Sequence, residues 1–372
     1  MAFGFPTFRQ PPLVTYGTGS LKSLGSNEGW ANTVLCTSAA PGVEAYLRQA
    51  WSKSGPDVST LRRLVKPAGE PTHEMVLAAA AELRNAPPTR LIAIGGGAVL
   101  DWARLAWLTS VGALDVDGRV HDGWQERRRA LDLVLVPTTC GSGAEAAAVA
   151  VLSIDGRKVP VVSPALLADQ VILDSRFLGS VSESTMASSV ADALSHAIEA
   201  WMSIVPGRLP RESAVSSLRL LLGDGPAYDR AARLMDAGFL GGVAAAHCSV
   251  GVVHAYAHSM ARFGLGHGHA NALALEPGLR RLLALPAAAG LLDQLGLNAA
   301  GLIERVGTLT AAAQAHPDSA IALAVLDAPG DRSALLEAMA AEPCLRTCPL
   351  PAATLDLDAF VDDVRDGVAQ RC

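Results

Sequence analysis

The sequence lacks long apolar runs, is poor in charge and has no excess of basic residues. No uninterrupted stretch reaches the roughly 18 apolar residues that a membrane-spanning helix needs, and the opening segment MAFGFPTFRQPP has no charged-then-apolar signal pattern. Only 18% of the 372 residues are charged, with 30 Lys and Arg against 36 Asp and Glu and a net charge of −6. Such a chain has no basic stripe to neutralise phosphates. We expect a soluble cytoplasmic protein that binds neither nucleic acid nor a membrane.

Cysteine is also scarce, and no CxxC pair occurs. In a long chain of which 50% is hydrophobic, scattered cysteines are typical of buried thiols in a reducing compartment. The same hydrophobic content excludes a mainly disordered chain, and the length suffices for two domains. The six cysteines are Cys36, Cys140, Cys248, Cys344, Cys348 and Cys372.

The two halves of the chain differ in their apolar patterns. In the first half, apolar runs expected to be strands (33–36, 61–65, 90–94 and 132–136) alternate with expected helices (42–54 and 74–85). This alternation predicts a parallel sheet with helices on both faces. Beyond about Asp174 the strand signals end, and amphipathic stretches rich in alanine and leucine follow. We therefore expect an α/β domain at 1–177 and a helical domain at 178–372.

Two glycine-containing turns follow expected strands. The first places Gly95, Gly96 and Gly97 before a helix, where backbone N–H groups could approach a pyrophosphate closely. It is not the GxGxxG fingerprint, and alone it is equally typical of a plain turn. The second, PTTCGSGAE at 137–145, offers hydroxyl groups and glycines suited to phosphate or ribose. Two such loops at strand ends together favour a nucleotide-binding crevice.

A set of histidines and one aspartate in the helical half has the spacing of metal ligands. Asp192 and His196 are four residues apart, as are His254 and His258, so each pair projects from one helix face. His267 follows in a loop. Each pair alone is commonly a surface or core pair, and a buried aspartate could cap a helix or pair with arginine. Convergence of imidazoles and a carboxylate would suit Fe²⁺ or Zn²⁺, and we favour that interpretation.

Together these segments resemble the iron-containing (group III) alcohol dehydrogenases of the dehydroquinate synthase-like superfamily. The resemblance runs from YGTGS at 16–20 to about Pro277, and the stretch 278–372 carries no identifying motif. Four patterns of the family have counterparts in this chain. GGGAVLDWAR at 95–104 matches GGGSxxDxAK, and PTTCGSGAE at 137–145 matches PTTxGTGSE. DSRFL at 174–178 with VADALSHAIE at 190–199 matches DPxL…GMDALTHAIE, and HAYAH at 254–258 with GHGHANA at 266–272 matches HAxAH…PHGxxNA.

The resemblance implies a fold, a cofactor and a set of site residues. The fold would be an α/β N-terminal Rossmann-like domain with a parallel sheet, plus an all-α C-terminal domain, with NAD(P)H and a metal in the cleft between them. His258 would be a catalytic histidine that does not bind the metal, and Lys158 would contact the nicotinamide ribose. The implied ligands of Fe²⁺ or Zn²⁺ are Asp192, His196, His254 and His267. The residues implied at the cofactor are Ser38, Gly95, Gly96, Gly97, Asp101, Thr138, Thr139, Ser142 and Lys158.

Several positions depart from the family pattern. Ala98 and Ala144 replace two serines, and each lost hydrogen bond would cost about 0.5–1.5 kcal/mol of cofactor binding. Arg104 replaces a lysine and keeps its charge, and Gly266 replaces a proline. Ser38 falls where NAD-preferring members carry an aspartate, so a 2′-phosphate would not be repelled. This favours NADPH slightly over NADH.

The implied reaction is reversible hydride transfer between NAD(P)H and a small aldehyde, giving a primary alcohol. The metal would act as a Lewis acid on the carbonyl oxygen, and His258 would relay the proton. Arg262 leaves room for an anionic aldehyde bearing a phosphonate or sulfonate group. A homodimer is the common arrangement of the family.

Two alternatives remain open at this point. A sugar-phosphate cyclase-type lyase shares the fold and binds NAD transiently, but it needs several basic residues near its motifs. A degenerate, non-catalytic family member is favoured slightly by the lost serines and opposed by the complete set of one Asp and three His.

Overall fold

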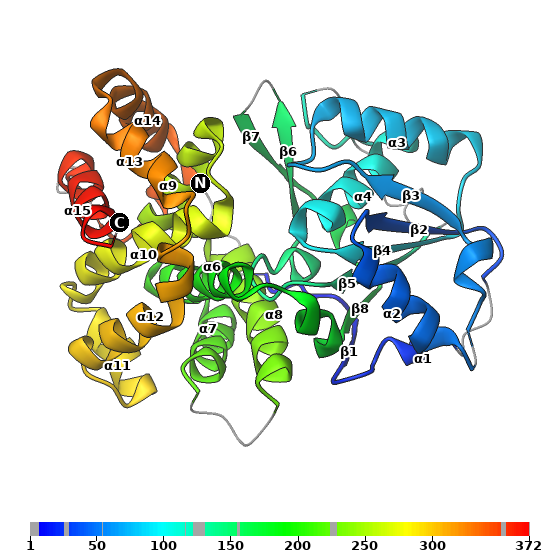
Figure 1. Ribbon diagram of the computed structural model, residues 1–372, viewed down its shortest axis with the longest axis horizontal. Coiled ribbons are helices and arrows are strands. Elements are labelled where there is room, and N and C mark those ends of the chain that lie inside the picture. Colours follow the sequence, from blue (N-terminus) through cyan, green and yellow to red (C-terminus); the bar gives the residue numbers. More distant parts are fainter. Residues whose placement is uncertain are drawn as a thin grey trace.

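A computed structural model describes residues 7–25, 30–53, 55–115, 117–121, 131–154, 157–223, 229–350 and 355–371. Its N-terminal part contains a six-stranded sheet in the order β1-β8-β5-β4-β2-β3, in which all neighbouring strands run parallel. Helices cover this sheet, and a helical half lies beside it (Figure 1). The expected fold class is confirmed. The strands are β1 (Leu13–Tyr16), β2 (Thr33–Ser38), β3 (Arg62–Lys66), β4 (Arg90–Gly95), β5 (Asp132–Pro137) and β8 (Gln170–Leu173).

Alternate residues of each central strand bury into different cores, because side chains of a strand point to opposite faces. In β4, Ile92 and Ile94 join the core beneath α1 (Lys22–Gly25) and α2 (Pro41–Trp51). Leu91 and Ala93 join the larger core beneath α3 (His73–Asn85) and α4 (Gly97–Ser110). A strand buried on both faces explains the continuous apolar run RLIAI.

The four strands expected from the sequence correspond to β2, β3, β4 and β5, and the two expected helices to α2 and α3. Sequence reasoning did not name β1, β8 or the antiparallel hairpin of β6 (Val149–Ile154) and β7 (Arg157–Val162). This hairpin packs against α4 and lies between the sheet and the helical half in the view of Figure 1.

The topology places a switch point at the C-terminal ends of β2 and β4. The chain leaves β2 through α2 on one face of the sheet and leaves β4 through α4 on the other. Ligands of open parallel sheets bind at such a switch point. Ser38 ends β2, and Gly95 ends β4 beside it in the sheet.

Helices make up the rest of the chain, and no strand follows Leu173 among the described residues. The expected boundary at 177/178 falls within a short 3-10 helix at Ser175–Ser180, and the division into two domains remains a prediction. α6 lies centrally, with α7, α8, α10 and α12 packed around it. The helices are α6 (Glu183–Met202), α7 (Arg208–Leu221), α8 (Arg230–Cys248), α9 (Val252–Met260), α10 (His267–Leu283), α11 (Ala288–Leu295), α12 (Ala299–Gln314), α13 (Ser319–Asp327), α14 (Pro329–Ala341) and α15 (Leu357–Ala369).

Two sequence expectations concern membranes and thiols. Within the described chain, no single helix has the length and apolarity to span a bilayer, while α8 and the segment Val252–Phe263 meet those criteria only as a pair bent by 99°. The five described cysteines are buried free thiols, as expected, and Cys372 lies outside the described residues.

The loop after β5 meets the helical half through glycine contacts. Gly143 has a φ of +57°, and a methyl group there would lie 2.3 Å from the Cα of Gly242 on α8. A methyl group at Gly238 would lie 2.2 Å from the carbonyl oxygen of Cys140. Only glycine permits these approaches, so the sequence itself brings the two main chains into direct contact.

A buried arginine fastens the β6–β7 region to α4. The side chain of Arg104 is 1% exposed and forms an ion pair with Asp101, one turn earlier on the same helix. Its guanidinium also donates to the carbonyl oxygens of Ala147 (2.8 Å), Val149 (2.9 Å) and Leu166 (3.1 Å). All of these acceptors belong to the protein, so Arg104 works as a structural clamp in this network.

Candidate active site

Three of the expected metal ligands converge between α6, α9 and α10. Asp192, His254 and His267 each offer a ligand atom within 4.8 Å of the others. The Nε2 atoms of His254 and His267 lie 3.6 and 3.5 Å from Oδ1 of Asp192. Asp192 and His254 are almost inaccessible within the helical half, while 23% of the His267 side chain is exposed. Two imidazoles and a carboxylate form a donor set suited to a divalent transition metal.

Two further buried side chains orient this cluster. Nδ1 of His254 contacts Oε2 of Glu199 at 2.7 Å, and the other carboxylate oxygen accepts the backbone N–H of Val253 at 2.8 Å. Asn271 donates to Oδ1 of Asp192 at 2.8 Å. A carboxylate on the far nitrogen of a histidine fixes the ring and its tautomer, as is common for metal ligands.

The electrostatics of the cluster are those of a carboxylate among imidazoles. Burial acts to raise the pKa of Asp192, but the three neighbouring histidines outweigh it and hold that pKa far below its usual range. Burial acts to lower the pKa of His254, but the nearby carboxylates of Asp192 and Glu199 outweigh it and raise that pKa to about 9. Nε2 of His254 is buried without a hydrogen-bond partner. An ion among these atoms would supply the missing partner.

His196 lies beside the three clustered ligands. Its ring stacks on His254 with centroids 4.6 Å apart, and its Nδ1 lies 3.9 Å from Oδ1 of Asp192. The same Nδ1 is 3.2 Å from the carbonyl oxygen of Gly141, and a hydrogen bond donated there would leave the lone pair of Nε2 available. Burial lowers the pKa of His196 to about 4, which favours the neutral ring that a ligand requires. Its role as a fourth ligand remains a prediction.

His258, the expected catalytic histidine, lies next to the cluster and has its own carboxylate partner. Its ring stacks on that of His267 with centroids 5.3 Å apart. Its Nδ1 contacts Oε2 of Glu342 at 3.0 Å, and 26% of its side chain is exposed. Burial lowers its pKa, and the hydrogen bond to Glu342 opposes that shift. The partly exposed His258 ring therefore lies beside the cluster of Asp192, His254 and His267, with one of its nitrogens held by the Glu342 carboxylate.

Lys158 reaches the same region from β7. Its Nζ forms an ion pair with Oε1 of Glu70 at 3.0 Å. Burial and then the charge of Lys158 lower the pKa of His267, and that charge also lowers the pKa of His258. The lysine therefore lies close enough to the histidines to act on them. Its contact with a nicotinamide ribose remains a prediction.

The two glycine-containing turns form one continuous surface. A methyl group at Gly96 would lie 3.6 Å from Thr139, and one at Gly97 would lie 2.7 Å from Oγ of Ser142. The backbone N–H of Thr138 donates to the carbonyl oxygen of Gly95 at 3.0 Å. The first turn opens α4, whose N-terminus carries no side-chain cap. Free N–H groups beside hydroxyl groups suit a pyrophosphate.

The second turn connects this surface to the histidine cluster. A methyl group at Gly141 would lie 3.1 Å from Oδ2 of Asp192. The second glycine-containing turn and the cluster of Asp192, His254 and His267 are therefore in contact. The sequence analysis expected the cofactor loops and the metal ligands to share one cleft, and this contact is what such an arrangement needs. Asp101 is placed differently: Arg104 occupies one carboxylate oxygen and the N–H of Val151 the other, at 2.9 Å. Its role at the cofactor remains a prediction.

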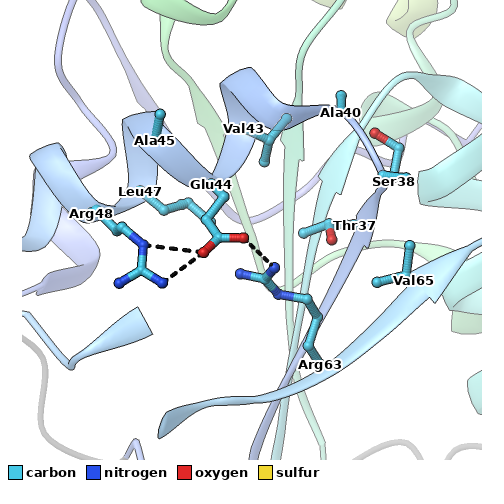
Figure 2. A pocket seen from close by; sticks show the side chains of 11 residues that line it. Thr37, Ser38, Ala40, Val43, Glu44, Ala45, Leu47, Arg48, Arg63 and Val65 are labelled. Atoms are coloured by element: carbon cyan, nitrogen blue, oxygen red, sulfur yellow. Dashed lines mark hydrogen bonds and ion pairs between the residues drawn. The ribbon is translucent and has the colours of Figure 1, made fainter. Parts of the chain in front are cut away.

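Ser38 lines a pocket of about 490 Å³ between the end of β2, α2 and β3. Figure 2 shows Glu44 in this pocket with its carboxylate between two guanidinium groups, and Ser38 on the far side of Thr37. Oε1 of Glu44 accepts from Arg48 at 2.6 Å, and Oε2 accepts from Arg63 at 2.7 Å. These hydrogen bonds lower the pKa of Glu44. The pocket therefore contains two guanidinium groups and one carboxylate, and both oxygens of that carboxylate already accept hydrogen bonds from those groups.

Three side chains of the site were not identified from the sequence. Glu199 is three residues after His196 and seven after Asp192, so helical spacing alone places all three on one face. Asn271 follows His267 by four residues, which is the same signal. Glu342 lies in the stretch without motifs, and only the tertiary fold brings it to His258.

Comparisons with known proteins identify the family. The family model for iron-containing alcohol dehydrogenase matches residues 11–175. The probable alcohol dehydrogenase EutG of Escherichia coli (strain K12) is 30% identical over 285 residues, which cover 72% of this chain and 71% of the relative. The protein of the same name from Salmonella typhimurium is 31% identical, with the same coverage.

Solved structures share the whole fold. An iron-containing alcohol dehydrogenase from Thermococcus thioreducens superposes with a TM-score of 0.81 at 20% identity, covering 97% of this chain and 100% of the other. A sulfoacetaldehyde reductase from Bifidobacterium kashiwanohense, solved with NAD⁺, gives a TM-score of 0.78 at 19% identity and covers 100% of both chains. With its motifs, its relatives and its fold in agreement, the chain belongs to the iron-containing alcohol dehydrogenases, oxidoreductases of the dehydroquinate synthase-like superfamily.

Proposed function

We propose that the protein reduces a small aldehyde to its primary alcohol with NAD(P)H, in a reaction that depends on one divalent metal ion. The observation that carries the proposal is the convergence of Asp192, His254 and His267, with a buried Nε2 of His254 that has no partner. These residues, together with His196, would hold Fe²⁺ or Zn²⁺. Such an ion supplies Lewis acidity toward the carbonyl oxygen of the substrate.

The side chains of the cleft would bind the cofactor and move the proton. The N-terminus of α4 and the hydroxyl groups of Thr139 and Ser142 would bind the pyrophosphate, and Lys158 the nicotinamide ribose. His258 would relay a proton from solvent to the former carbonyl oxygen of the reduced aldehyde, directly or through water, while Glu342 keeps its ring in place. The family's common homodimer would be the active form, which light scattering on the purified protein tests.

The pocket at Ser38 favours NADPH as the reductant. A 2′-phosphate there would meet the Ser38 hydroxyl and the guanidinium of Arg63, and the pocket's only carboxylate, Glu44, is already occupied by two arginines. NAD-selective sites instead present a free acidic side chain to the ribose 2′-hydroxyl.

Ser38→Asp is expected to weaken NADPH binding by about tenfold or more, since the new carboxylate would repel the 2′-phosphate and each 1.4 kcal/mol of repulsion is a factor of ten. NADH binding should be unchanged or tighter. Dissociation constants from nicotinamide fluorescence would measure both. Ser38→Asn is the matched control without charge and should keep the wild-type preference. Equal weakening of both cofactors by the aspartate would contradict the assignment of this pocket.

The finer proposal is that the substrate aldehyde carries an anionic group. Lys158 brings positive charge to the histidines, Arg262 is exposed on the segment between His258 and His267, and the fold is used by a sulfoacetaldehyde reductase. A phosphonate or sulfonate near the carbonyl would suit this charge.

Steady-state oxidation of NADPH by the Fe²⁺- or Zn²⁺-loaded protein tests the function. The panel should pair neutral aldehydes, such as propionaldehyde and butyraldehyde, with sulfoacetaldehyde and phosphonoacetaldehyde at equal concentrations. We expect metal-dependent turnover and a kcat/KM at least about tenfold higher for the anionic members. Turnover of neutral aldehydes alone would overturn the anionic substrate. Full metal loading without oxidation of NADPH or NADH by any aldehyde would overturn the reductase and favour a lyase or a non-catalytic protein.

A further inference from the structure

A second group of side chains with potential metal-binding atoms lies where the first turn of α10 meets the loop between α12 and α13, apart from the cluster of Asp192, His254 and His267. His269, His316 and Asp318 each offer a ligand atom within 4.8 Å of the others. His269 comes from α10, and the other two come from the short loop that joins α12 to α13. None of the three belongs to the Asp192 cluster, and the proposed reaction uses none of them.

Hydrogen bonds fix the tautomer of His269. Its Nε2 lies 3.2 Å from Oγ of Ser319, and that hydroxyl donates its own hydrogen to the carbonyl oxygen of Gln314 at 2.9 Å. The hydroxyl oxygen therefore accepts, and Nε2 of His269 must carry the proton. The lone pair of Nδ1 is left for another partner. A buried group that fixes the far nitrogen in this way is typical of the surroundings of a metal-ligating histidine.

His316 presents an unprotonated nitrogen to a carboxylate. Its Nδ1 accepts the backbone N–H of Asp318 at 3.2 Å, and Oδ2 of Asp318 lies 3.5 Å from the same Nδ1. The one lone pair of Nδ1 is directed at that N–H, so an ion bound through Nδ1 of His316 would replace this hydrogen bond and have Oδ2 of Asp318 beside it. The ring of His316 lies 4.9 Å from that of His269, edge to face.

The loop that carries these groups is held in one shape. The backbone N–H of Ser319 donates to the carbonyl oxygen of His316 at 2.9 Å, and that of Ile321 donates to Asp318 at the same distance. Apart from the hydrogen bond that Nδ1 of His316 would give up, binding would therefore need little reorganisation. The side chain of Asp318 is 54% exposed and that of His316 is 36% exposed, so an ion could arrive from solvent and keep water ligands.

We propose that His269, His316 and Asp318 bind one divalent transition-metal ion, of which Zn²⁺ is the representative probe. Two imidazoles and one carboxylate with open positions suit Zn²⁺, Co²⁺ or Ni²⁺ and disfavour Mg²⁺ or Ca²⁺, which select oxygen ligands. The ion would join the first turn of α10, two residues from His267, to the α12–α13 loop. Because its exposed side keeps water ligands, it would bind more weakly than an ion in the buried cluster.

Counting the ions bound per chain tests the site. Purified full-length protein, stripped of metal and titrated with Zn²⁺ in a calorimeter, should bind one ion more per chain than His316→Ala does. Asp318→Asn should weaken the same event by at least about tenfold, which is 1.4 kcal/mol. Asp318 makes no side-chain cap bond to α13, so this second variant should keep the fold if the first does not.

His121→Ala is the matched control, because His121 is an exposed histidine beside a carboxylate, Asp115, at 3.9 Å, without a third ligand in the described chain. It should bind as many ions as the wild type. The expected difference of one ion between His316→Ala and wild type holds whether or not the Asp192 cluster is loaded, so the two proposals can fail separately. Equal stoichiometry and affinity in the wild type, His316→Ala and Asp318→Asn would overturn the second site.

Discussion

Replacing His267 by alanine is expected to give a protein that contains no tightly bound metal and has lost at least about a thousandfold in aldehyde reduction. The change removes one of the three donors gathered at Asp192 and leaves that aspartate with His254 and the neighbouring His196. Loss of Lewis acidity costs several kcal/mol of transition-state stabilisation, and each 1.36 kcal/mol is a factor of ten. Elemental analysis and NADPH oxidation measure the two effects.

His258→Ala is the informative partner of that variant. Its ring lies against His267 but is bonded to Glu342, so its removal should leave the metal content intact. Turnover should fall by about a hundredfold to ten-thousandfold, the usual worth of a positioned acid or base. Stoichiometric metal in purified His267→Ala that also carries His316→Ala, or loss of metal from His258→Ala, would show that the two roles are assigned to the wrong residues.

Arg104→Ala is expected to produce the largest loss of stability, about 3–5 kcal/mol in the free energy of unfolding. The change leaves the buried carboxyl of Asp101 without its cation, and burial already raises the pKa of that group. It also leaves the carbonyl oxygens of Ala147, Val149 and Leu166 without their shared donor. Urea unfolding followed by circular dichroism measures the effect.

Arg365→Ala provides a control of the same chemistry on the surface. Arg365 contacts Asp327 at 2.5 Å, but 44% of its side chain is exposed, and exposed pairs are worth at most about 1 kcal/mol. Losses of similar size in both variants would mean that Arg104 does not fasten the β6–β7 region. A stable Arg104→Ala protein with altered cofactor binding would instead place the guanidinium at the cofactor.

The sequence predicted the elements whose signal is local. β2, β4 and β5 are buried on both faces, so their apolar runs are visible without any partner, and the glycines after β4 mark its end. β1 and β8 are strands of four residues, and β1 is partly exposed at the sheet edge, so neither gives a strong pattern. Arg104 holds the β6–β7 hairpin to α4 through hydrogen bonds to residues more than 40 positions away in the sequence, and no local pattern indicates such contacts.

In the candidate site, too, residues with a local sequence pattern could be predicted, and residues placed by the tertiary fold could not. Asp192 and His254 belong to motifs with helical spacing, and the structure brings them together with His267. Glu199 was hidden within a motif because its role depends on the ring of His254, which comes from another helix. Glu342 carries no local signal at all. The two cations proposed to face the substrate, Lys158 and Arg262, come from different halves of the chain, and spacing along a sequence holds no information about such a surface.

The bare contact between Gly143 and Gly242 has a mechanical consequence. Two main chains that meet without intervening side chains leave no room for a methyl group, so a side chain at either position would push the loop after β5 away from α8. Because Gly141 belongs to the same loop and lies against Asp192, that shift would also disturb the geometry of the histidine cluster.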